Sequence, residues 1–196
     1  MLRKRVTLII TFSLLVIGIF LITQPNKNNA KVNKYAQDDH SFVLNTKNGQ
    51  ITNDTFKGKA VVLFFGYMNC PDICPTALTD INNAMKDLTN TEKKNTQVIF
   101  VSVDPKRDTV DLLDEYVKYF NNSFIGATSN VKYLRELTRK FYADFSYHED
   151  KNSAAGYSVA HTGRIYILNK QGKLVNTLGS NQVVISDITK AIKEVL

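Results

Sequence analysis

Two long apolar runs, each followed by residues with helical periodicity, constrain the fold more than any other feature. The first covers residues 60–65 and the second residues 98–103, and both are rich in β-branched and aromatic side chains. Runs of this kind, without regular polar alternation, are typical of strands that are buried on both faces. They predict a central sheet that is covered by other elements on each side.

Amphipathic helices are expected after each apolar run. The first carries an apolar stripe at helical spacing, made of Leu78, Ile81, Met85 and Leu88. Further helices are predicted over residues 110–120 and around residues 131–141, and Asp108 or Thr109 is placed to cap the first of these.

The C-terminal part predicts a hairpin and a last helix. Residues 165–168 and 174–178 flank an Asn-Lys-Gln-Gly turn, and Ser186 is expected to cap a helix. The resulting order of elements is that of an α/β, thioredoxin-like fold with an insertion before the hairpin, in which helices flank a central mixed sheet. Periodicity alone does not separate this fold from other α/β sandwiches, so the cysteines have to decide.

An apolar leader at residues 6–22 follows a basic cluster at residues 3–5. A membrane-spanning helix needs about 20 apolar residues, with a lower limit near 17, so the leader is just long enough. No good small-x-small cleavage site follows it. We expect residues 1–24 to be an uncleaved, single-pass membrane anchor, residues 25–39 a flexible linker, and residues 40–196 the folded domain. The positive-inside rule places the N-terminus in the cytoplasm and the domain on the extracytoplasmic side of the cell membrane.

The charge distribution argues against nucleic acid as a partner. The chain has 25 Lys and Arg against 18 Asp and Glu, and three of the basic residues precede the leader. The other lysines are scattered among Asp, Glu and Asn, which is typical of a solvated surface.

The chemistry is concentrated where the first apolar run ends. Residues 66–75 contain Cys70 and Cys74, and a predicted helix follows them. Ligands bind beyond the carboxyl ends of strands in open α/β sheets, and a helix N-terminus lowers the pKa of a nearby thiol. If the segment is helical, a four-residue spacing puts both sulfurs on one face, where they can hold one ion or form a disulfide. The flanking Pro, Asp and Asn indicate a partly open loop.

A histidine can complete a site of this kind, because soft thiolates favour Cu(I) and an imidazole can serve as a further ligand. His161 is the best placed, since it lies where the chain enters the closing hairpin. A lone histidine is more often structural than a ligand, so the residues alone leave its role open. His40 and His148 lie among polar residues and are expected at the surface.

Three ordered motifs resemble the Sco/SenC family of copper-binding assembly factors. They are residues 66–75, residues 102–109, and His161 ahead of residues 166–168. The resemblance covers the chain from about His40 to the C-terminus and implies a thioredoxin-like fold. It also implies that Cys70, Cys74 and His161 are the copper ligands. The implied role is delivery of copper to the dinuclear copper site of cytochrome c oxidase subunit II, or reduction of that subunit's cysteines before metallation.

One position departs from the family pattern. Family members commonly carry Asp immediately before this histidine, whereas this chain has Ala160. The substitution removes a carboxylate that can orient a ligand, which bears on copper affinity. Asp104 and Asp108 are expected to end the strand and cap the next helix, and Asp104 is also a candidate for a residue behind the ligands.

Two enzymatic functions compete with the chaperone. A thiol-disulfide oxidoreductase would use Cys70 and Cys74 as a redox disulfide without metal. The three-residue separation and the presence of His161 count against a general oxidoreductase, although not against a dedicated reductant. A thiol peroxidase of the same fold is disfavoured by the cysteine spacing and by the absence of Trp.

Overall fold

The computed structural model describes residues 39–149, 155–179 and 184–196. The predicted anchor, and all of the predicted linker except Asp39, lie outside these ranges. Within the ranges, no helix is long and apolar enough to cross a membrane.

A five-stranded mixed sheet with the strand order β5-β4-β3-β8-β9 forms the centre of the domain. Its middle strand β3 (Ala60–Gly66) is parallel to β4 (Thr96–Ser102), which is parallel to β5 (Ile125–Ala127). On its other side β3 is antiparallel to β8 (Arg164–Leu168), which pairs with β9 (Leu174–Gly179). The first apolar run therefore occupies the most enclosed position in the sheet.

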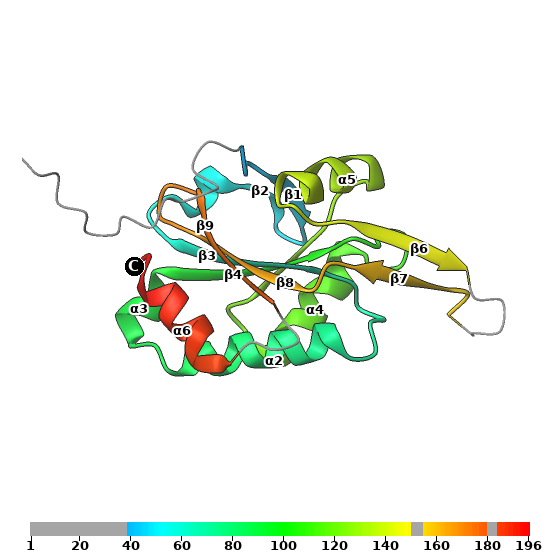
Figure 1. The fold of residues 1–196 in the computed structure, drawn as a ribbon. Helices are drawn as coiled ribbons and strands as arrows, with labels where there is room; N and C mark the ends of the chain where they lie inside the picture. Colours follow the sequence, from blue (N-terminus) through cyan, green and yellow to red (C-terminus); the bar gives the residue numbers. More distant parts are fainter. Residues whose placement is uncertain (1–38, 150–154, 180–183) are drawn as a thin grey trace, which may run out of the picture. The chain divides into compact units, whose positions relative to one another are not determined.

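Four helices lie on one side of the sheet. They are α2 (Ile73–Lys86), the short α3 (Asn90–Lys94), α4 (Val110–Phe120) and α6 (Ile185–Lys193) (Figure 1). The apolar stripe predicted for α2 is buried, but Leu88 lies beyond the helix, which ends at Lys86. In α2, α4 and α6 the apolar residues face the sheet and the charged residues face solvent, as expected for surface helices.

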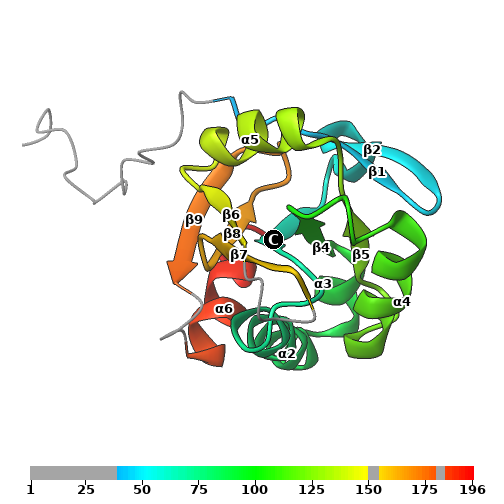
Figure 2. The same cartoon turned by 90° about the vertical axis from the view of Figure 1, so that its right-hand side faces the viewer.

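The opposite side of the sheet is covered by α5 (Val131–Lys140) and by the hairpin of β1 (Val43–Thr46) and β2 (Gly49–Thr52), with the 3₁₀ turn η1 (Asn53–Phe56) after it (Figure 2). All seven residues of β3 are buried as a result. The prediction of a central mixed sheet flanked by helices is confirmed.

A second hairpin is formed by β6 (Phe145–Glu149) and β7 (Tyr157–His161) in the region predicted as an insertion. It is a separate two-stranded sheet and projects beyond the central sheet (Figure 1). Because Phe145 pairs with His161, this hairpin sets the position of that histidine.

The structure contradicts one predicted helix cap and confirms another. The N-cap of α6 is Val184, and it makes no side-chain cap bond, so the assignment of Ser186 as cap was wrong. Thr109 caps α4 by accepting a hydrogen bond from the Leu112 amide, which leaves Asp108 for a different role.

Gly126 in β5 provides a test of the packing between α4 and the sheet. A Cβ atom at this position would lie 2.6 Å from the Leu113 carbonyl oxygen, which is backbone and cannot rotate away. We predict that Gly126→Ala lowers the free energy of unfolding by about 1–3 kcal/mol, as overpacking does elsewhere. Urea unfolding measures the change. Gly179→Ala is the control, because nothing lies within 4 Å of its Cβ position; equal stability of the two variants would contradict this account.

Candidate metal centre

The two cysteines lie in the loop that joins β3 to α2. The Cys70 amide donates to the Tyr67 carbonyl at 3.3 Å, which closes a tight turn after the strand. Since α2 begins at Ile73, Cys74 is in its first turn and Cys70 precedes it. The sulfurs approach each other because of this turn, and not because both residues occupy one helical face.

Gly66, the last residue of β3, leaves the space that Cys74 occupies. A Cβ at Gly66 would lie 2.6 Å from the Cys74 Sγ and 2.7 Å from the ring of Phe100. The Cys74 side chain is fully enclosed, and Cys70 is only 8% exposed. The backbone of the cysteine loop is therefore partly open, as predicted, but the two thiols point inward and are buried.

His161 is the last residue of β7 and reaches the cysteines from the other side. Its Nε2 lies 3.4 Å from the Cys74 Sγ. The imidazole packs edge-on against the rings of Phe64 and Tyr67, with centroid distances of 6.2 and 5.7 Å. Its Nδ1 is 3.4 Å from the Thr162 carbonyl oxygen. The ring is thus held with Nε2 directed at the sulfurs.

One ligand atom from each of Cys70, Cys74 and His161 lies within 4.8 Å of the other two. Sulfur and nitrogen ligands at about 2.0–2.3 Å from one ion are at most about 4.6 Å apart. A small contraction is enough for the three atoms to surround a single ion. Two sulfurs and an imidazole suit a soft or borderline metal such as Cu(I).

In the metal-free site, Cys74 is a protonated thiol and Cys70 is a thiolate at neutral pH. The thiol of Cys74 donates a hydrogen bond to Cys70 and thereby lowers the pKa of Cys70 to about 4, with further contributions from His161 and the amides of the helix start. The pKa of Cys74 is raised, because it holds that proton, is buried and lies beside the Cys70 anion. The lowered pKa that the sequence predicts for both thiols is therefore found only for Cys70.

Asp104 bears on this site through the hairpin that carries His161. Its buried carboxylate accepts a hydrogen bond from the Tyr157 hydroxyl at 2.7 Å and pairs with Arg107. The Arg107 guanidinium donates to the Tyr157 carbonyl at 2.9 Å and stacks on the Tyr157 ring at 3.7 Å. Asp104, the residue predicted to lie behind the ligands, thus fixes the β6–β7 hairpin to the end of β4.

Asp108 is a site residue that the sequence reasoning missed. Its buried carboxylate accepts hydrogen bonds from the Met68 amide at 2.9 Å and from the Ser102 hydroxyl at 2.6 Å, so it holds the cysteine loop against β4. Burial raises the pKa of Asp108, as expected for a carboxyl removed from water. The signal in the sequence was the presence of two aspartates, Asp104 and Asp108, after a buried strand, since a helix cap requires only one.

The other two histidines lie away from the cysteines. His40 is buried and packs edge-on against Phe141 with centroids 5.2 Å apart, so its predicted surface position was wrong. His148 is exposed and hydrogen-bonds to Ser146 at 2.7 Å, as predicted for a surface residue.

A shallow cavity of about 240 Å³ lies beside His161. It is lined by Asp144, Phe145, Ser146, Ala160, His161 and Thr162. The small side chain of Ala160 is part of this wall, so the position that departs from the family pattern borders an open approach to the imidazole.

Comparison with known proteins identifies the class of this domain. The SCO1/SenC family model matches residues 30–196, and the chain therefore belongs to the SCO1/SenC family.

Individual relatives agree with this assignment. A SCO2-like protein of Rickettsia prowazekii is 36% identical over 133 residues, which are 67% of this chain and 64% of the relative. The match thus spans slightly less than two thirds of that protein. The apo Sco1 structure from Thermus thermophilus superimposes with a TM-score of 0.72 at 31% identity, covering 80% of this chain and 90% of the other. An Arabidopsis thaliana ScoI structure with copper bound gives 0.69 at 30% identity, covering 79% and 95%.

The unequal thiols predict an unusual alkylation profile for the reduced, metal-free protein. With a pKa of about 4, Cys70 stays a thiolate when the pH falls from about 9 to about 6, whereas an ordinary thiol becomes tenfold less ionised with each unit below about 8.5. We expect one iodoacetamide adduct, on Cys70, at a rate that declines only below about pH 5. Mass spectrometry of timed samples measures this rate.

The Cys74→Ala variant is the matched control, because it removes the donor that stabilises the Cys70 thiolate. Its alkylation rate should fall with decreasing pH from a higher midpoint. Identical pH profiles for the variant and the parent protein would contradict the shared-proton arrangement.

Proposed function

We propose that this chain binds one copper ion through Cys70, Cys74 and His161 and delivers it to a cytochrome c oxidase. The observation that carries the proposal is the convergence of two sulfurs and one imidazole within 4.8 Å at the end of the central strand. The copper-bound ScoI relative from Arabidopsis supports copper as the metal. We further propose that the recipient is the dinuclear copper site of cytochrome c oxidase subunit II.

The protonation of the two thiols fits a metal carrier. Metal ligands must be deprotonated, and Cys70 already meets this condition at neutral pH. The Cys74 proton has to leave when its sulfur binds the ion, so binding releases a proton and strengthens as the pH rises. Cys70 can therefore bind the metal directly, whereas Cys74 loses its proton only when the metal binds.

Delivery to a client requires access, and access is greatest at His161. Its side chain is partly exposed, and the cavity beside it is open, whereas Cys74 is enclosed. We propose that ligands of the client approach past Ala160 and take the place of the imidazole. With Ala160 in place of a carboxylate, the orientation of His161 depends on its contacts with Phe64, Tyr67 and Thr162.

A dedicated thiol-disulfide reductase for the client's copper-ligand cysteines is the second candidate. The observation that favours it is the Cys70 thiolate beside a protonated Cys74. In this function the Cys70 thiolate attacks the client disulfide, and a client thiolate leaves. Cys74, after losing its proton, then displaces the second client thiolate and forms the Cys70–Cys74 disulfide.

We further propose that residues 6–22 anchor the chain in the cell membrane with the folded domain on the extracytoplasmic side. An apolar leader behind a basic cluster supports this arrangement. A copper-receiving oxidase in the same membrane would then lie within reach of residues 40–196.

Anaerobic copper titration of the reduced protein tests the chaperone proposal. We expect one tightly bound Cu(I) per chain. Cys70→Ser and Cys74→Ser should each abolish tight binding, because a hydroxyl does not supply a soft anionic ligand. Competition with a chelator of known affinity measures the loss, and stoichiometric tight binding by either variant would exclude the proposed ligand set.

The His161→Ala variant separates the chaperone from the reductase. It removes one ligand but keeps both sulfurs, so it should bind copper more weakly and still form a reversible Cys70–Cys74 disulfide. Cells that contain only this variant should lack oxidase activity at limiting copper and recover it when copper is added. Full activity at limiting copper would favour the reductase.

The anchor proposal has a test of its own. The intact protein should keep residues 1–24 and sediment with membranes, and top-down mass spectrometry of the native protein determines its first residue. A mature chain that starts near Lys31 in the soluble exported fraction would contradict the anchor.

A further inference from the structure

A second concave site lies at the opposite end of β3 and β4 from the cysteines. It is a cavity of about 640 Å³ between the start of β4, the end of α2 and the loop after α4. This volume is in the range of small-molecule sites. Because each strand contributes seven residues, about 20 Å of sheet separates the cavity from the cysteine loop.

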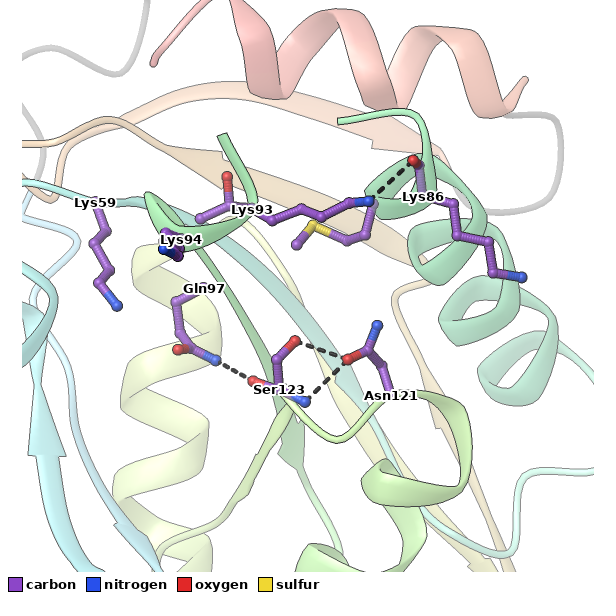
Figure 3. Close-up of a pocket in the computed structure, with 9 residues that line it drawn as sticks. Lys59, Lys86, Lys93, Lys94, Gln97, Asn121 and Ser123 are labelled. Atoms are coloured by element: carbon purple, nitrogen blue, oxygen red, sulfur yellow. Dashed lines mark hydrogen bonds between the residues drawn. The ribbon is translucent and has the colours of Figure 1, made fainter. Parts of the chain in front are cut away.

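Four lysines surround this cavity. Lys59, from the segment before β3, and Lys86, from the end of α2, lie on opposite sides, with Lys93 and Lys94 of α3 between them (Figure 3). Over the part of the chain that the structure describes, no carboxylate lines the cavity, and none of these four lysines forms an ion pair. The cavity therefore carries a concentrated positive charge without a protein counter-ion.

Neighbouring polar groups fix this arrangement. Lys93 donates to the Lys86 carbonyl at 3.2 Å, and Lys86 donates to the Asn83 side chain at 3.0 Å. The nearby carboxylate of Glu92 is already engaged, because it caps α3 by accepting from the Thr89 amide at 2.7 Å. Lys93 and Lys86 are thus held by neutral acceptors, which leave their charge uncompensated.

The floor of the cavity is polar and internally hydrogen-bonded. Gln97 donates to the Ser123 carbonyl at 2.7 Å, and Ser123 donates to the Asn121 side chain (Figure 3). Since these groups are paired with each other, the lysines remain the principal donors for an incoming molecule.

We propose that this cavity binds a compact polyanion of the phosphate class, such as a di- or triphosphate group. Four lysines around one cavity that no carboxylate of the described chain lines match a ligand with several negative charges, and lysines act as point-charge phosphate binders. The concave shape suits a compact anion better than a flat membrane surface. This proposal goes beyond the copper function and does not depend on it, since no residue is shared with the cysteine site.

Binding of inorganic tripolyphosphate to the full chain in neutral detergent tests the proposal, with calorimetry as the measurement. We expect one site per chain and affinity that falls as salt rises. The variant Lys59→Gln/Lys94→Gln should bind at least about tenfold more weakly, because it removes two of four charges without breaking the Lys93 hydrogen bond. Lys118→Gln/Lys132→Gln is the charge-matched control on α4 and α5, and its affinity should change less than about twofold.

Further measurements distinguish the possible outcomes. Tripolyphosphate should slow acylation of Lys59 and Lys94 but not of Lys132, as read by mass spectrometry, and Cys70→Ser should bind it as the parent protein does. No binding, or an equal loss in the control variant, would overturn the proposal. Protection of Lys59 and Lys94 by nanodiscs of anionic phospholipid, but not by tripolyphosphate, would also overturn the proposal. The lysine-lined surface would then be a membrane contact.

Discussion

Strands β3 and β4 pair in parallel, and this pairing brings their last residues, Gly66 and Ser102, to the same edge of the sheet. The cysteine loop follows one strand, and the loop with the two aspartates follows the other. Asp108 joins them, because its carboxylate accepts from the Ser102 hydroxyl and from the Met68 amide. A one-residue shift in this pairing would reverse the faces of the strand, and Gly66 would no longer leave room for the Cys74 sulfur.

The site combines a rigid side and an exposed side. Cys74 is packed in the core between β3 and α2. Its hydrogen bond to Cys70, together with burial, raises its pKa, which opposes a second thiolate until a cation is present. His161 is carried by a two-stranded hairpin outside the central sheet, and that hairpin is held by Asp104, Arg107 and Tyr157. The sulfurs are therefore fixed in the core, and the ligand set is most accessible from the side of the histidine.

The central elements were predictable because their signals are local. The continuous apolar character of β3 and the helical spacing in α4 follow from burial, and both elements have the expected bounds within one residue. The β6–β7 hairpin was missed because its burial alternates weakly and its strands pair only with each other. The proximity of Cys70 and Cys74 to His161 could be inferred only from the fold. The role of Asp108 depends on a contact forty residues away, which periodicity does not reveal.

The separation of the two concave sites has a physical consequence. The lysine cavity adjoins Thr96 at the start of β4, and the cysteine loop lies beyond the ends of β3 and β4. Although Cys70 is buried, the lysine cavity is at the surface, and about 20 Å is well beyond the screening length of about 8 Å that applies to charges in contact with solvent at physiological ionic strength. An anion bound among the lysines would therefore have little direct effect on the ionisation of Cys70. Coupling between the sites would require movement of the sheet itself, and the β3–β4 core is close-packed on both faces, which resists such movement.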